Sequence, residues 1–105
     1  PQAISKNNKV YFKEGMVLSN EPGYYENGKF GIRIENLVRV KKNKKGYLFD
    51  NLTMAPIDKS LINKRMMEKN EIVWLNKYHR NVLNNLKKFM NRSELLELKL
   101  ACSKI

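Results

Sequence analysis

The stretch SNEPGYYENGKFGIRIEN, Ser19 to Asn36, contains a β-hairpin signal between two strand-like segments. Asn27-Gly28 is a strong signal for a two-residue β-hairpin, since both central residues of a type I′ turn need positive φ. Pro22 holds Glu21 in an extended conformation, because the α region would clash with the proline ring. We therefore predict two antiparallel strands that meet at Asn27-Gly28.

Residues on both sides of this stretch extend the strand pattern. The run Phe30 to Val40 alternates in polarity, as a strand with two different faces does. One face carries Ile32, Ile34, Asn36, Val38 and Val40, and the other carries Gly31, Arg33, Glu35, Leu37 and Arg39. Gly15 to Asn20 reads as a buried strand, and Val10 to Phe12 has weak strand character. Residues 46–57 predict one or two more strands, the second at an edge because of Pro56.

The pattern changes to helical from about Glu68 onward. Apolar residues recur at steps of three and four up to Met90, which predicts a helix with one apolar stripe. Asn91 followed by Glu94 resembles a capping box, so we expect a second helix through Leu95 to Ala101. Strands that precede helices predict an α+β fold, with a strand-rich portion at 1–66 and a helical extension at 67–105.

Composition restricts the classes of protein that the chain can belong to. Its 105 residues are 42% hydrophobic, which is ordinary for one globular domain with a modest core. Apolar runs are too short for a membrane span, and we expect no signal peptide. The single cysteine, Cys102, excludes an internal disulfide framework and fits a reducing compartment.

The formal charge of +11 has two explanations. A basic surface can bind nucleic acid or an anionic membrane. Alternatively the composition is biased, because 14 asparagines accompany the lysines along the whole chain. Only the segment Val40 to Gly46 clusters lysines, without the interleaved aromatics of nucleic-acid binders, and we favour the compositional explanation.

Glu21 and Glu35 stand at unusual positions for carboxylates in so basic a chain. In a two-residue hairpin Glu21 faces Ile34 and Glu35 faces Asn20, which puts the carboxylates on opposite faces. One extra residue, for instance a bulge at Pro22-Gly23, would bring the two glutamates opposite each other. Opposed carboxylates must bind a cation, share a proton or pair with an arginine.

Two interpretations of the glutamates therefore stay open. Arg33 shares a face with Glu35 and can neutralise the pair. Alternatively, carboxylates on neighbouring strands hold two divalent ions about 3.5–4 Å apart, which activate a water molecule. Tyr78 or His79 belongs to the apolar stripe of the predicted helix. His79, whose neighbours Tyr78 and Arg80 read as ordinary helix surface, is not expected to be a ligand.

The chain closely resembles aminopeptidase P, the Xaa-Pro aminopeptidase family, in its cytosolic eukaryotic form. NEPGYYENGKFGIRIEN reproduces a long family motif, in which EP and RIEN stand at the family spacing. LTMAPID and EIVWLNKYHRNV resemble the C-terminal strand and helix of the same form. The resemblance implies the C-terminal half of the pita-bread fold, which prolidase, creatinase and methionine aminopeptidase share.

The resemblance also implies roles for single residues. Glu21 would ligate one metal ion and take part in proton transfer, and Glu35 would bridge two ions. These would be two divalent ions, Mn²⁺ most commonly, with Zn²⁺ or Co²⁺ in related enzymes. Their bound hydroxide would attack the bond between an N-terminal residue and a following proline. Arg33 would position and balance charge, while Tyr24 and Tyr25 match aromatic positions near the site.

Two aspartates and one histidine of the family site, all from upstream, are absent from this sequence. We therefore expect the C-terminal piece of a larger enzyme, inactive by itself and completed by the upstream remainder. The expected partners are peptides with proline at the second position and a second copy in a homodimer. A cytoplasmic location is expected, without membrane or nucleic-acid partners. Prolidase, or a non-catalytic pita-bread homologue that acts as a binding protein, is the alternative.

Overall fold

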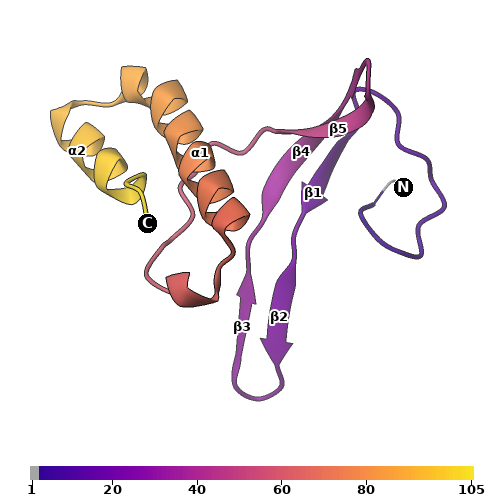
Figure 1. Cartoon of the computed structure of the whole chain (residues 1–105), viewed down its shortest axis with the longest axis horizontal. Coiled ribbons are helices and arrows are strands. Elements are labelled where there is room, and N and C mark those ends of the chain that lie inside the picture. Colours follow the sequence, from indigo (N-terminus) through magenta and orange to yellow (C-terminus); the bar gives the residue numbers. More distant parts are fainter. Residues whose placement is uncertain (1–2) are drawn as a thin grey trace. The chain divides into compact units, whose positions relative to one another are not determined.

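The computed structural model describes residues 3–105 and divides into two compact units, Pro1–Thr53 and Met54–Ile105 (Figure 1). Antiparallel strands make up the first unit and helices dominate the second, which confirms the α+β class. A partition at residues 66 and 67 stays a prediction from the sequence. No helix among the described residues is both long enough and apolar enough to cross a membrane.

The described residues of the first unit form five strands in two antiparallel sheets. The larger sheet has the order β1-β4-β5, formed by Val17–Asn20, Asn36–Asn43 and Gly46–Asn51. The smaller one pairs β2 (Gly23–Glu26) with β3 (Phe30–Arg33). In Figure 1 this two-stranded ribbon continues the line of β1 and β4 to the hairpin turn. The predicted strand from Phe30 to Val40 is thus two strands with a short break.

A small apolar core holds the larger sheet together. Leu18, Val38 and Val40 are buried, and Phe12 and Met16 pack against them. The predicted strand character of Val10 to Phe12 is wrong, because this segment joins no sheet. The Asn8 side chain accepts the Val10 N–H at 2.7 Å, which supplies a local partner in place of a neighbouring strand.

The hairpin turn has one residue more than the sequence predicted. Glu26 pairs with Phe30, so that Asn27, Gly28 and Lys29 form a three-residue loop. The Lys29 N–H donates to the Glu26 carbonyl at 3.0 Å. Gly28 has φ +69°, whereas no non-glycine residue of the described chain has positive φ. The predicted type I′ turn is therefore wrong, since Asn27 would also need a positive φ.

Two helices with capping boxes form the second unit. The predicted first helix is confirmed as α1 (Lys69–Leu86), followed by the 3₁₀ turn η2 (Lys87–Phe89). Asn91 caps α2 (Arg92–Ala101) as expected, since its side chain accepts the Glu94 N–H at 3.0 Å. A further 3₁₀ turn, η1, spans Lys64–Met66. The core consists of Leu75, Tyr78, Val82, Leu98 and Cys102.

The second strand predicted within residues 46–57 is absent from the described structure. Side chains of α1 bind this backbone where a neighbouring strand would otherwise do so. The Tyr78 hydroxyl donates to the Ala55 carbonyl at 2.7 Å, and the Ile57 N–H donates to His79 Nε2 at 3.1 Å. A neighbouring strand is therefore not needed to satisfy these two groups.

His79 is completely buried. The prediction that both of its neighbours form ordinary helix surface is wrong for Tyr78. Tyr78 is also buried, at 6% exposure, whereas Arg80 is exposed as predicted. Burial lowers the pKa of His79, and the positive charge of Lys59 lowers it further. Since Nε2 accepts the Ile57 N–H, the imidazole is neutral and carries its proton on Nδ1.

This burial predicts a dependence of stability on pH. The unfolded chain binds a proton at His79 near the ordinary pKa of 6.5, whereas the folded chain resists protonation. The contribution of neutral His79 to the free energy of unfolding is therefore fully present above pH 6.5, and it is lost as the pH falls below that value. We expect the midpoint of urea unfolding to decrease between pH 7.5 and 5.5, and to decrease less in His79→Gln. Equal pH profiles of the two proteins would contradict this assignment.

Candidate metal centre

The strand register places Glu21 opposite Glu35. The pairs that flank the glutamates are Asn20 with Asn36 and Gly23 with Arg33. The two segments between these pairs, residues 21–22 and 34–35, each contain two residues, so neither strand has an inserted residue there. Between them, the Pro22 carbonyl accepts the Ile34 N–H at 3.2 Å. The extra residue that brings the carboxylates together thus lies in the hairpin turn, and the suggested bulge at Pro22-Gly23 is wrong.

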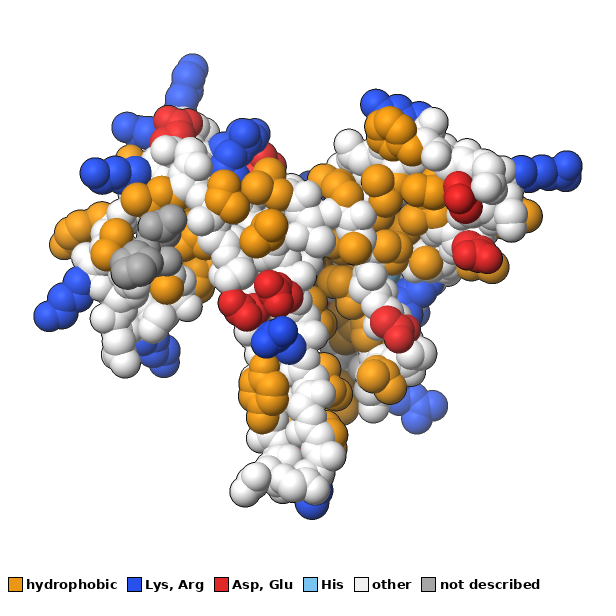
Figure 2. All heavy atoms as spheres, turned by 180° about the vertical axis from the view of Figure 1, so that it is seen from behind, with side chains coloured by type: hydrophobic (Ala, Val, Ile, Leu, Met, Phe, Trp, Pro, Cys, Tyr) orange, Lys and Arg blue, Asp and Glu red, His pale blue; other side chains and the backbone are white. Residues whose placement is uncertain are grey.

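Arg33 lies between the two carboxylates. Its Nη1 is 3.9 Å from Glu21 Oε2, and its Nε is 3.5 Å from Glu35 Oε2. The glutamate side chains are 44% and 45% exposed, so solvent screens both ion pairs. Figure 2 shows acidic and basic side chains together where the β2–β3 ribbon leaves the sheet. The guanidinium offsets the repulsion that two opposed carboxylates exert on each other.

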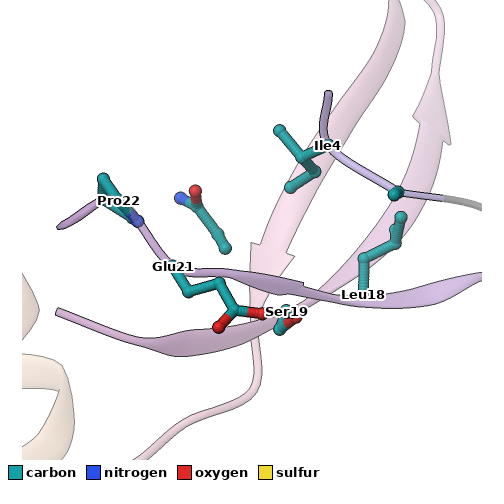
Figure 3. Close-up of a pocket in the computed structure, with 7 residues that line it drawn as sticks. Ile4, Leu18, Ser19, Glu21 and Pro22 are labelled. Atoms are coloured by element: carbon teal, nitrogen blue, oxygen red, sulfur yellow. Dashed lines mark hydrogen bonds between the residues drawn. The ribbon is translucent and has the colours of Figure 1, made fainter. Parts of the chain in front are cut away.

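Ser19 is the third side chain that contacts the glutamates. Its hydroxyl donates to Glu21 Oε1 at 2.6 Å, and Figure 3 shows the Glu21 carboxylate turned along the strand toward Ser19. Ser19 was not among the site residues predicted from the sequence, although the sequence contains a signal for it. Residues two apart on a strand share a face, so Ser19 and Glu21 point to the same side of the sheet.

The two tyrosines of the motif lie on different faces of the ribbon. Tyr25 shares the face of the glutamates, because its ring covers Gly23 and Gly31. A Cβ at either glycine would lie 2.6 Å from an atom of the Tyr25 side chain. Tyr24 faces the other side, where its ring centroid lies 6.1 Å from that of Phe30. Glycines at these two positions therefore leave room for an aromatic ring beside the acidic pair.

A cavity of about 370 Å³ adjoins Glu21 (Figure 3). It lies between the N-terminal segment and the end of β1, and part of its lining is polar. The lining residues are Ala3, Ile4, Leu18, Ser19, Asn20, Glu21 and Pro22. One of the two carboxylates is thus accessible from a hollow large enough for several water molecules.

The donor set fits part of a divalent-metal site. Carboxylate oxygens suit hard and borderline ions such as Mn²⁺, and these ions require four to six ligands each. Within residues 3–105 no group of three or more His, Cys, Asp or Glu side chains could hold an ion. His79 adds no ligand through Nε2, which is engaged by Ile57. Glu21 and Glu35 can therefore supply two of the ligands that such a site requires.

Comparison with known families agrees with this chemistry. Residues 1–42 match the family described as metallopeptidase family M24, and residues 45–105 match the C-terminal region of peptidase M24. The chain therefore belongs to the M24 metallopeptidase family, as the sequence motifs indicated.

Its similar relatives are Xaa-Pro aminopeptidases. A probable Xaa-Pro aminopeptidase P of Laccaria bicolor is 49% identical over 69% of this chain and 12% of its own length. The corresponding protein of Metarhizium robertsii is 47% identical over 83% of the chain and 15% of its own length. Xaa-Pro aminopeptidase 1 of Dictyostelium discoideum is 44% identical over 78% of this chain and 14% of its own length. The chain thus spans about one seventh of the length of these curated relatives.

A solved structure also matches the fold. The X-prolyl aminopeptidase of Caenorhabditis elegans, described as a cytosolic enzyme with a di-nuclear active site, aligns with a TM-score of 0.81. The two chains are 33% identical, and the match covers 96% of this chain and 18% of the other. The expected pita-bread architecture, of which this chain has the C-terminal part, is confirmed by this match.

Proposed function

We propose that this chain acts as the C-terminal part of the catalytic domain of a longer, metal-dependent Xaa-Pro aminopeptidase. That enzyme would hydrolyse the bond between an N-terminal residue and a following proline. The observation that carries the proposal is the opposition of Glu21 and Glu35 on one face of the hairpin. The names of the relatives and of the structural neighbour support the reaction class.

Glu21 and Glu35 would hold two divalent ions, which would activate water for attack on the peptide carbonyl. Glu35 would bridge the two ions, and Glu21 would bind one of them and accept a proton during the reaction. We favour Mn²⁺, with Zn²⁺ or Co²⁺ as the other candidates. The di-nuclear site named for the Caenorhabditis elegans enzyme supports two ions, and the oxygen ligands suit Mn²⁺.

Arg33 would serve the site without contacting the reacting atoms. Its guanidinium lies within 3.9 Å of Glu21 and 3.5 Å of Glu35, so it can hold both carboxylates in place. Its positive charge would lower the repulsion between them before the ions bind. The guanidinium would thereby hold the two carboxylates close together, as two ligands of one metal centre must be.

The remaining ligands would come from the upstream part of the same enzyme. A homodimer and a cytosolic location complete the proposal, the latter supported by the description of the structural neighbour as cytosolic. A nucleic-acid partner is not proposed, since the Lys and Arg side chains on the face drawn in Figure 2 are dispersed. Prolidase and a non-catalytic binding protein are less well supported, because the relatives are named as aminopeptidases.

The test uses the full-length enzyme and three peptides. We expect hydrolysis of a tripeptide with proline at position two, but not of the same peptide with alanine there. Removal of metal by a chelator should abolish the activity, and added Mn²⁺ should restore it more fully than Zn²⁺ or Co²⁺. Cleavage of the Xaa-Pro dipeptide alone would indicate prolidase, and activity that resists complete metal removal would contradict the proposal.

A further inference from the structure

We propose that Ser19 is a positioning residue that orients the Glu21 carboxylate for metal binding through its hydroxyl hydrogen bond. The inference rests on the proposed function and assigns a supporting role to a residue that is not among the proposed metal ligands. It starts from the 2.6 Å separation of Ser19 Oγ and Glu21 Oε1, the shortest of the contacts that Glu21 makes among the described residues.

The hydrogen bond distinguishes the two oxygens of Glu21. Oε1 accepts the proton of the Ser19 hydroxyl, while Oε2 lies 3.9 Å from Arg33 Nη1, beyond hydrogen-bond distance. Oε2 is consequently the oxygen with more free acceptor capacity for a cation. A hydrogen bond to one carboxylate oxygen also restricts rotation of the group, which reduces the entropy that metal binding must remove.

The two glutamates differ in this respect. Glu35 contacts Arg33 at 3.5 Å, and no described hydroxyl donates to it. Glu21 contacts both the Arg33 guanidinium and the Ser19 hydroxyl. Ser19 thereby makes an otherwise symmetric pair of opposed carboxylates asymmetric. This asymmetry suits one carboxylate that binds a single ion and another that bridges two.

Ser19 is well placed to hold this orientation. It belongs to β1, pairs with Leu37 of β4 and is half-buried, so its backbone is fixed by the larger sheet. Glu21 follows two positions later, just beyond the end of β1, and Pro22 limits its backbone. The hydrogen bond from Ser19 therefore holds the Glu21 side chain, which lies just beyond the end of β1, in place relative to a strand that the sheet fixes.

The experiment compares Ser19→Thr with Ser19→Val in the full-length enzyme. The two side chains have nearly the same shape and both suit a strand, but only threonine has the hydroxyl. Titration of the metal-free enzyme with Mn²⁺ should show two sites in wild type and in Ser19→Thr. In Ser19→Val the affinity of one site should fall by about tenfold, the lower end of the effect of such supporting residues.

Activity and stability provide further readouts. With saturating Mn²⁺, Ser19→Thr should retain kcat, while Ser19→Val should have a lower kcat and a nearly unchanged KM. Unfolding midpoints of the two metal-free variants should agree, because the strand tolerates both residues. If Ser19→Val is misfolded, Ser19→Ala replaces it in the same comparison.

Three outcomes of the Mn²⁺ titrations test the proposed role of Ser19. Equal Mn²⁺ affinities of Ser19→Val and wild type would overturn the role of Ser19 while leaving the proposed function intact. Weaker binding in Ser19→Val than in Ser19→Thr would support it. Failure of wild type to bind Mn²⁺, or unchanged binding in Glu21→Gln, would overturn the metal site itself and the role of Ser19 with it.

Discussion

The substitution Glu35→Gln is expected to lower kcat/KM of the full-length enzyme by about 1000-fold, and the enzyme should bind fewer than two metal ions. An amide carries no negative charge and cannot bridge two ions as a carboxylate does. Metal ions contribute several kcal/mol to transition-state stabilisation, and about 4 kcal/mol corresponds to a factor of about 1000 in rate. Steady-state kinetics and elemental analysis of the purified variant measure both effects.

Glu26→Gln is the matched control for that variant. Glu26 lies on the same hairpin and pairs with Lys29 at 3.0 Å, an exposed contact of little energetic value. Its replacement should change neither metal content nor kcat/KM. If Glu35→Gln retains two ions and normal activity, Glu35 is only an ion-pair partner of Arg33. Both carboxylate variants should keep the hairpin, since the exposed ion pairs contribute little to folding.

The second large effect is expected in the helical unit, where His79→Ala should lower the free energy of unfolding by roughly 3 kcal/mol. The substitution removes a completely buried ring and leaves a cavity. It also leaves the Ile57 N–H without the acceptor that now lies 3.1 Å away, and an unpaired buried donor costs about 1–3 kcal/mol. Urea unfolding followed by circular dichroism measures the change.

Amide hydrogen exchange at Ile57 separates the two contributions to this effect. Exchange should accelerate strongly in His79→Ala and less in His79→Gln, because a glutamine oxygen can accept the same N–H. A stability of His79→Ala within about 0.5 kcal/mol of wild type, the range of ordinary surface substitutions, would show that the imidazole does not support the fold.

Local signals predicted the helices well. The apolar stripe that begins near Ile72 and the Asn91–Glu94 capping box both act within one or two turns. Their effects therefore do not depend on distant parts of the chain. The hydrogen bond between His79 and the Ile57 N–H could not be predicted in this way, because the two residues are 22 positions apart in sequence.

The opposition of Glu21 and Glu35 in the candidate site depends on whether the hairpin turn contains two residues or three. Asn27-Gly28 favours a two-residue turn by local preference, and that turn would separate the glutamates onto opposite faces. The structure includes Lys29 in the loop, which shifts the register by one and brings Glu21 opposite Glu35. The sequence permits this pairing through a bulge, but the local preference of Asn27-Gly28 for a two-residue turn favours the other register.

The metal site proposed for Glu21 and Glu35 can be observed directly in a crystal. The most direct test is anomalous X-ray diffraction from crystals of the full-length enzyme with bound Mn²⁺. We expect two anomalous peaks about 3.5–4 Å apart, with Glu35 in contact with both and Glu21 in contact with one. Peaks elsewhere in the protein, with Arg33 still paired to both carboxylates, would contradict it.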